Sequence, residues 1–202
     1  MPLETSFAEA PGSDPLAIFL EWQKAAVERG LPAADAFALA TSTLEGRPSV
    51  RIVLFKGVVN GTVRLVTNYE SRKGQELSKN PFAALTFFWP ALERQVRMEG
   101  RVERASAAES DAYFATRDRQ SQLGAWASAQ SRPVASRAAL DAELASVRQR
   151  FEGRAVPRPE HWGVLAFVPE RIELWLGGPH RLHDRFAYTR DGGAWRVERL
   201  AP

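Results

Sequence analysis

The chain has 202 residues, of which 45% are hydrophobic and 25% charged, and its formal net charge at pH 7 is +3, so it is long enough to bury a core within one domain. It contains no cysteine, which excludes disulfides, cysteine-ligated metal sites and a thiol nucleophile. No apolar run approaches the roughly 20 residues that span a bilayer, and residues 1–13 lack the pattern of a signal peptide, so we expect a cytoplasmic protein that does not bind membranes. Basic residues are interleaved with acidic ones, so we expect no binding of nucleic acid.

The first half of the chain predicts one helix, several strands and a second helix. Ser13, Asp14 and Pro15 are typical of a helix start, with Ser13 as the cap, and apolar residues then recur at helical spacing up to Gly30. Strands are expected at 37–43, 50–55 and 62–67, and the Asn60-Gly61 pair predicts a hairpin before the last of them. A short helix is expected at 71–79.

The second half predicts mainly strands, with helices between them. Two long strands are expected at 82–89 and 95–102, and helices at 106–114 and 137–151, whereas 117–133 shows no clear pattern. After a proline- and glycine-rich connector at 153–159, strands are expected at 163–168, 171–175, 183–189 and 194–200, the last two joined by a turn at 191–193.

Many strands joined by short turns favour a mainly β fold, an antiparallel barrel with peripheral helices. We expect a flexible N-terminal segment at 1–13 and a single domain at 14–202. Neither a Gly-x-Gly-x-x-Gly nor a Walker sequence is present, so those dinucleotide and nucleoside triphosphate sites are not indicated. No metal site is expected.

Two cations, Arg72 and Lys73, stand at the start of the helix expected at 71–79. Positive side chains there oppose the positive end of the helix dipole, which favours an anion between them, and a phosphate fits well. The alternative is a pair of solvated surface cations.

A second concentration of charge is the run 180–185 (HRLHDR). If the run is extended, Arg181, His183 and Arg185 share one face, and burying three such groups requires a negative or electron-rich partner. Trp175 lies just upstream. The alternative is an edge strand that faces water.

Tyr113, Arg117 and Ser121 follow each other at a spacing of four, which keeps residues near one face of a helix. A phenol, a guanidinium and a hydroxyl together make a phosphate clamp, although an ordinary polar helix face has the same spacing. Lys56 ends an apolar strand and Gln95 begins one, and each gains meaning only beside the other sites.

These motifs together resemble the pyridoxamine 5′-phosphate oxidase family, whose members use FMN. The resemblance covers about 14–202. It rests on 51–56 (RIVLFK), 71–73 (SRK), 92–96 (LERQV), 121–126 (SQLGAW), 130–131 (QS), 177–185 (GGPHRLHDR) and the ending 195–202. The last of the internal motifs is specific only in company with the others.

The resemblance implies an FMN-binding split β-barrel and a homodimer with the flavin at the subunit interface. It assigns to FMN the residues Arg51, Ile52, Val53, Leu54, Val66, Thr67, Arg72, Lys73, Gln95, Gln130, Ser131, Trp175 and Arg185. It assigns to the substrate phosphate Lys56, Tyr113, Arg117 and Ser121, and to the substrate's pyridine side the catalytic pair Arg181 and His183.

The sequence departs from the family pattern at three places. Leu174 and Leu176 stand where the family has an aromatic residue and a glutamine, and Leu176 cannot donate a hydrogen bond. Val66 replaces a commoner tyrosine, and 1–13 lack the Arg and Tyr of the family's N-terminal lid.

The resemblance implies oxidation of pyridoxamine and pyridoxine 5′-phosphates by dioxygen, which gives pyridoxal 5′-phosphate and hydrogen peroxide. One alternative is a related flavin oxidase acting on another aromatic substrate, such as a phenazine precursor. Another is a non-catalytic binder of flavin or pyridoxal phosphate. The phosphate-clamp residues argue against the first, and Arg181 with His183 against the second.

Overall fold

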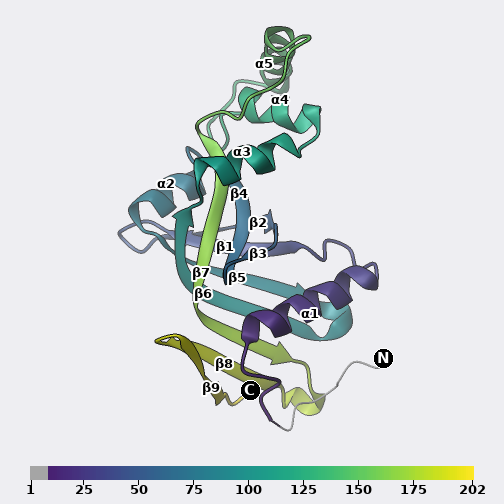
Figure 1. Cartoon of the computed structure of the whole chain (residues 1–202), viewed down its shortest axis with the longest axis vertical. Helices are drawn as coiled ribbons and strands as arrows, with labels where there is room; N and C mark the ends of the chain where they lie inside the picture. Colours follow the sequence, from purple (N-terminus) through teal and green to yellow (C-terminus); the bar gives the residue numbers. More distant parts are fainter. Residues whose placement is uncertain (1–8) are drawn as a thin grey trace.

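The computed structural model describes residues 9–202, and its centre is one antiparallel sheet (Figure 1). Along this sheet the strands follow the order β2-β1-β5-β6-β7-β4-β3, and β8 pairs with β7 and β9. The strands are β1 (Ala36–Ser42), β2 (Pro48–Leu54), β3 (Val58–Val59), β4 (Thr62–Asn68), β5 (Phe82–Trp89), β6 (Arg94–Arg104), β7 (Trp162–Leu176), β8 (Asp184–Asp191) and β9 (Ala194–Arg199). The mainly β, antiparallel split-barrel prediction is therefore confirmed.

Five α-helices accompany the sheet in the described part of the chain: α1 (Pro15–Glu28), α2 (Arg72–Lys79), α3 (Ala107–Ala115), α4 (Arg119–Ala127) and α5 (Arg137–Arg150). Short 3-10 turns lie at Pro90–Leu92 and Pro179–Arg181. Helix α4 occupies the segment that the sequence left unassigned. None of the helices within 9–202 is long and apolar enough to cross a membrane.

The first helix is capped by Asp14 rather than by the predicted Ser13. The Asp14 carboxylate accepts hydrogen bonds from the backbone N–H groups of Leu16 and Ala17, at 3.0 and 3.4 Å. A carboxylate at this position also interacts favourably with the helix dipole. Most of the predicted flexible segment, residues 1–8, lies outside the described residues. Further along it, the Gly12 carbonyl accepts a hydrogen bond from the Tyr188 hydroxyl at 2.9 Å.

Strand β7 is one continuous strand, whereas the sequence predicted two, at 163–168 and 171–175. Pro169 lies at a bulge: Gly100 of β6 pairs with Pro169 and Glu99 pairs with Arg171, so the register shifts there. Before the bulge β7 pairs with β4, and after it with β8, while β6 follows it throughout. The bulge therefore divides β7 into two ends that lie in different parts of the molecule (Figure 1).

Two hydrophobic clusters support these two parts. The larger packs α1 against the sheet, with Phe19, Phe87 and Trp89 in ring contact. The smaller joins α3, α4 and α5 to the start of β7 around Trp162. Gly74 allows α2 to sit directly on the strand end before it, because a Cβ atom there would lie 2.2 Å from the Tyr69 carbonyl oxygen.

Candidate functional site

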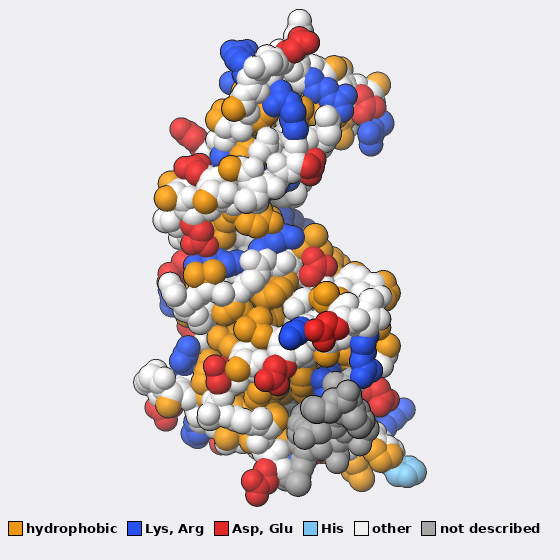
Figure 2. All heavy atoms as spheres, turned by 45° about the vertical axis from the view of Figure 1, so that its right-hand side comes forward, with side chains coloured by type: hydrophobic (Ala, Val, Ile, Leu, Met, Phe, Trp, Pro, Cys, Tyr) orange, Lys and Arg blue, Asp and Glu red, His pale blue; other side chains and the backbone are white. Residues whose placement is uncertain are grey.

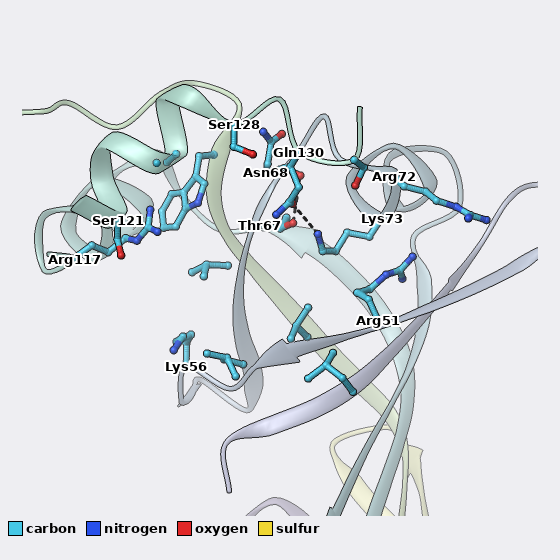
Figure 3. Close-up of a pocket in the computed structure, with 18 of the residues that line it drawn as sticks. Arg51, Lys56, Thr67, Asn68, Arg72, Lys73, Arg117, Ser121, Ser128 and Gln130 are labelled. Carbon is cyan, nitrogen blue, oxygen red and sulfur yellow. Dashed lines mark hydrogen bonds between the residues drawn. The ribbon is translucent and has the colours of Figure 1, made fainter. Parts of the chain in front are cut away.

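A cavity of about 740 Å³ lies between β2, β4, α2 and α4, with a size typical of cofactor and ligand sites. Figure 3 shows the polar side chains around it, which come from several elements. The cavity brings together most of the predicted residues: Arg51, Ile52, Val53, Leu54, Lys56, Val66, Thr67, Arg72, Lys73, Arg117, Ser121, Gln130 and Ser131.

One end of the cavity is formed by the start of α2. The buried Lys73 ammonium donates hydrogen bonds to Ser71 Oγ at 3.2 Å and to Gln130 Oε1 at 2.9 Å. Burial, together with the positive charge of Arg51, lowers the pKa of Lys73 to about 8. In the described part of the chain Lys73 forms no ion pair with a carboxylate. An anion bound at this end would offset both the burial of the Lys73 ammonium and its repulsion by Arg51.

Arg51 and Arg72 flank this end from β2 and α2. The Arg51 Nη1 atom donates to the Leu39 carbonyl at 3.1 Å and to Thr41 Oγ1 at 2.6 Å. Burial lowers the pKa of Arg51, although the Glu76 carboxylate opposes this. The Arg72 side chain is directed away from the cavity (Figure 3), and its Nε donates to Glu76 Oε1 at 2.9 Å.

The opposite end of the cavity is formed by Arg117, Ser121 and Lys56 (Figure 3). The Arg117 guanidinium lies over the Trp162 ring, with 4.6 Å between its Cζ atom and the ring centroid. Its Nη1 atom is buried and has no hydrogen-bond partner among the described residues. Burial also lowers the pKa of Arg117, so an acceptor at this end would satisfy an otherwise costly group.

The predicted helical face shared by Tyr113, Arg117 and Ser121 is wrong. Helix α3 ends at Ala115, and α4 begins after Asp118, whose carboxylate caps it by accepting the Ser121 N–H at 2.9 Å. Tyr113 does not line the cavity but stacks against Trp162, with 6.2 Å between ring centroids. Tyr113 and Arg117 therefore lie close together because both contact the Trp162 ring, not because they share a helix.

A second group of predicted residues lies at the far end of β7. Gln95 of β6 pairs with Trp175 of β7, which pairs with Arg185 of β8, so the three form a row across the sheet on one face. The Arg185 Nε atom donates to Glu173 Oε1 at 2.8 Å, and its Nη1 donates to the Ala201 carbonyl at 2.8 Å.

The predicted extended face of Arg181, His183 and Arg185 is also wrong. Pro179–Arg181 forms a 3-10 turn, His180 and Arg181 have φ values of 55° and 63°, and β8 begins only at Asp184. Proline fixes the start of this turn, which the Leu182 N–H closes on the Pro179 carbonyl at 3.0 Å. Arg181 is exposed in the turn, outside any strand face.

His183 nevertheless joins the second group. Its ring lies on Trp175, with 4.6 Å between centroids, and its Nδ1 accepts the Gly178 N–H at 3.2 Å. This bond leaves the proton of the neutral ring on Nε2.

The two groups are well separated within one chain. Val66 beside the cavity pairs with Val164, and Trp175 lies eleven residues further along the same strand, which corresponds to roughly 35 Å of strand length. Ile52 and Leu54 at the cavity are 67% and 46% exposed, although they are large and apolar. Hydrophobic side chains also gather at the middle of the face shown in Figure 2. Such surface is typical of an interface.

Several residues at the site were not singled out by sequence reasoning. Asn68, Ser128 and Trp162 line the cavity, and nothing in their local sequence marks them. Two buried acids, Glu76 and Glu173, hold the arginines of the two groups. The one available signal was Glu173, an acid within the otherwise apolar run 172–176 of β7. Burial opposes its ionisation, but hydrogen bonds from Arg185 and Arg97 lower its pKa.

The donors fit an elongated ligand with an anionic group toward each end, or two ligands with one anion each. Ammonium, guanidinium and hydroxyl groups at the two ends suit phosphate oxygens. Among the described residues no cluster of three or more histidine, aspartate or glutamate side chains is arranged to hold a metal ion.

Family models match nearly all of this architecture. The model described as "Pyridoxamine 5'-phosphate oxidase" matches residues 23–151, and the "Pyridoxine 5'-phosphate oxidase C-terminal dimerisation region" matches residues 162–202. A Rubrobacter xylanophilus protein named pyridoxine/pyridoxamine 5′-phosphate oxidase is 53% identical over 94% of this chain and 87% of its own length. A Pseudomonas putida protein of the same name is 52% identical over 96% of this chain and 91% of its own.

Solved structures with the same fold include PhzG from Burkholderia lata, in complex with tetrahydrophenazine-1-carboxylic acid. It is 31% identical, has a TM-score of 0.89, and the match covers 95% of this chain and 94% of PhzG. A pyridoxamine 5′-phosphate oxidase-related, FMN-binding protein from Nostoc punctiforme has a TM-score of 0.71 at 21% identity, with 96% and 99% of the two chains covered, which shows the fold alone. Sequence and structure therefore agree that the chain belongs to the pyridoxamine 5′-phosphate oxidase family.

Proposed function

We propose that the protein is an FMN-dependent oxidase of pyridoxamine 5′-phosphate and pyridoxine 5′-phosphate. Each substrate becomes pyridoxal 5′-phosphate while dioxygen becomes hydrogen peroxide, and the amine substrate also consumes water and releases ammonia. The observation that carries the proposal is the cavity with a cationic group at each end, one around Lys73 and one around Arg117. An enzyme that holds a phosphorylated flavin and a phosphorylated substrate together needs two such ends.

The end at α2 is the proposed place of the FMN phosphate. Arg51, Arg72 and Lys73 supply the positive charge, and Thr67, Gln130 and Ser131 line the cavity beside them. When bound, the flavin supplies the redox chemistry, taking a hydride equivalent from the substrate and passing electrons to dioxygen. The chain's own contribution is to bind, orient and shield the reacting groups.

The end at α4 is the proposed place of the substrate phosphate. Arg117, Ser121 and Lys56 line this end of the cavity. A phosphate oxygen there would accept a hydrogen bond from Arg117 Nη1, which has no partner among the described residues. Tyr113 is also assigned to this end, because it contacts the same Trp162 ring as Arg117. A phosphate held here fixes one end of the substrate, so that its reacting carbon is placed by the length of the molecule.

The second group is proposed to complete the site from a partner subunit. Gln95, Trp175 and Arg185 would contact the flavin, and Arg181 and His183 the pyridine side of the substrate. The separation of the two groups along β7 supports a homodimer, as does the family's C-terminal dimerisation region at 162–202. In this arrangement residues 14–202 act as one domain. The cytoplasmic location stays a prediction.

Arg181 and His183 are proposed to act at the reacting end of the substrate. Arg181 stands in the exposed turn, where its guanidinium can hold the pyridine side against the flavin. His183 presents Nε2–H when neutral, because Nδ1 is engaged by the Gly178 N–H. This histidine is therefore suited to donate a hydrogen bond to the substrate or to exchange a proton with it.

The likeness to PhzG favours a second candidate, an oxidase of a reduced phenazine carboxylate. A carboxylate would also pair with Arg117. We favour the phosphorylated pyridine because Arg117, Ser121 and Lys56 offer more donors than one carboxylate uses, and because the relatives at about 52% identity carry the oxidase name. A flavin or pyridoxal phosphate binder without activity gives no role to Arg181 and His183.

The proposal is tested by purifying the protein, recording its visible spectrum and identifying the flavin released on denaturation. The FMN-loaded protein is then given each substrate in an oxygen electrode, and pyridoxal phosphate is measured by its absorbance. We expect a yellow protein that releases FMN and consumes oxygen with both substrates. A protein that does not bind added FMN, or FMN-loaded protein that consumes no oxygen with either, contradicts the proposal.

A further inference from the structure

A buried carboxylate lies directly behind the cationic end at α2. Glu76 is four residues after Arg72, so the two side chains lie on the same face of α2, one turn apart. The Glu76 side chain is only 7% exposed and does not line the main cavity. It lines a smaller groove together with Arg72 and Glu45, and Arg72 lines both this groove and the main cavity.

Donors from three elements converge on the two oxygens of this carboxylate. Oε1 accepts from Arg72 Nε at 2.9 Å. Oε2 accepts from the Ser49 hydroxyl at 2.6 Å, from the Thr41 hydroxyl, and at 3.5 Å from Arg51 Nη2. Thr41 in turn accepts from Arg51 Nη1, so Arg51 is held both directly and through Thr41.

Glu76 is ionised throughout the physiological pH range. Burial opposes ionisation, but hydrogen bonds from Ser49, Thr41 and Arg72 outweigh it and lower the pKa of Glu76 to about 2. Its charge reduces the three cations Arg51, Arg72 and Lys73 to a net charge of +2. A phosphate monoester carries about −1.5 to −2 at neutral pH, so the site and the ligand are closely matched.

The geometry also reduces the entropy lost on binding. Arginine side chains have many rotamers, and ordering them when a ligand arrives weakens affinity. Glu76 cannot move freely, because α2 and the hydroxyls of β1 and β2 hold it. It therefore fixes Arg51 and Arg72 before any ligand binds.

We propose that Glu76 is the positioning residue of the cofactor-phosphate site: through hydrogen bonds it holds Arg51 beside the proposed phosphate position and Arg72 at the edge of the cavity, and so sets the affinity for the phosphate of the flavin without touching it. This inference rests on the proposed FMN site. Binding of FMN by the parent protein tests that site separately, and the variants below test Glu76.

The test compares FMN with riboflavin, which has the same ring system but no phosphate. Dissociation constants of both flavins are measured by fluorescence quenching on the flavin-free protein. Glu76→Ala is expected to weaken FMN about tenfold, as when a charge-assisted contact is misaligned, and to change riboflavin binding less than about twofold. Glu76→Gln keeps one acceptor oxygen, which can retain the contacts of Oε2 to Thr41, Ser49 and Arg51 but not also that of Oε1 to Arg72, so it is expected to restore part of the FMN affinity.

Glu45→Gln is the matched control for charge. Glu45 lines the same groove and is exposed. Its substitution removes one negative charge near Arg72 while Glu76 keeps all its contacts. FMN affinity is expected to change less than about twofold in this variant. Thr41→Val is the second test, because it removes a hydroxyl that links Glu76 to Arg51 and preserves both shape and charge.

The outcomes distinguish a positioning role for Glu76 from two others, a repelling charge and a general structural role. A loss of FMN affinity confined to the phosphate, with rescue by Gln, supports the positioning role. Unchanged or tighter FMN binding in Glu76→Ala would overturn it, because Glu76 would then act only as a repelling charge. Equal losses for FMN and riboflavin, or no rescue by Gln, would also overturn it. If Glu76→Ala does not fold, Thr41→Val decides by the same comparison of FMN with riboflavin.

Discussion

The Lys73 ammonium donates a hydrogen bond to Gln130 Oε1 at 2.9 Å and thereby ties the start of α2 to the segment that follows α4. These residues are 57 positions apart in the chain, and both line the cavity. The bond places a buried cation at the junction of two elements that carry the two anion-binding ends of the site. The protonation state of Lys73 should therefore directly affect the affinity of the protein for FMN.

FMN binding should weaken as the pH rises through about 8. Burial and Arg51 lower the pKa of Lys73 to about 8, and a bound phosphate favours the charged form and raises that pKa again. Affinity is therefore full below pH 8 and declines above it, where the free protein loses the proton. Titrations of the flavin-free protein from about pH 7 to about pH 9.5 measure this dependence.

Lys73→Met supplies the control for this dependence. The variant should bind FMN more weakly, by about tenfold or more, with an affinity that no longer changes near pH 8. Riboflavin binding to the parent protein should be flat over the same range. If the variant keeps the pH dependence of the parent, another group causes it.

Arg117→Ala should abolish much of the preference for phosphorylated substrates. A charge-assisted hydrogen bond contributes about 1.5–3 kcal/mol, so kcat/KM for pyridoxamine 5′-phosphate should fall about tenfold to a hundredfold, mainly through KM. Turnover of pyridoxamine without phosphate should be low in the parent and change little. Arg137→Ala, an exposed arginine on α5, is the control and should behave as the parent does. Equal turnover of both substrates by the parent protein would refute the assignment.

Arg181→Ala should slow reduction of the flavin while FMN stays bound. A lost transition-state contact of about 2.7 kcal/mol corresponds to about a hundredfold in rate. Anaerobic stopped-flow mixing with pyridoxamine 5′-phosphate measures the step, and His180→Ala in the same exposed turn is the control. A normal reduction rate at full FMN occupancy would remove Arg181 from the reaction.

The protein should be a dimer, and disrupting the dimer should cost it the flavin. Ile52→Glu places a charge on an exposed apolar position of β2, and light scattering should show more monomer; because Ile52 also lines the cavity, FMN loss is attributed to the dimer only where it follows the monomer fraction on dilution. Val27→Glu, on the exposed side of α1, is the matched control. A monomeric parent protein with full flavin occupancy would contradict the shared site.

The sequence identified most cavity residues but not how the chain brings them together. The pattern at 71–79 predicted α2 and its cations correctly, because capping and charge are local properties. The spacing of Tyr113, Arg117 and Ser121 was misleading, because Asp118 starts a new helix between them. Likewise, nothing local shows that His180 and Arg181 adopt positive φ values.

Contacts between residues far apart in the chain were the hardest to predict from the sequence. Two strands were expected at 163–168 and 171–175, yet a bulge in β7 at 169–171 lets this strand continue alongside β6. The contacts of Glu76 depend on Thr41 and Ser49, which lie 35 and 27 residues away in sequence. Single-residue patterns do not encode such pairings, because they arise from strand register.

The proposed function requires that the bound flavin oxidises a phosphorylated pyridine. The most direct measurement is the flavin absorbance of the FMN-loaded protein after anaerobic mixing with pyridoxamine 5′-phosphate, followed by air. We expect the flavin absorbance to bleach with one pyridoxal 5′-phosphate formed per flavin, and to recover on admission of air while hydrogen peroxide is formed. A flavin that stays oxidised with pyridoxamine and pyridoxine 5′-phosphates, but is reduced by tetrahydrophenazine-1-carboxylic acid, would contradict it.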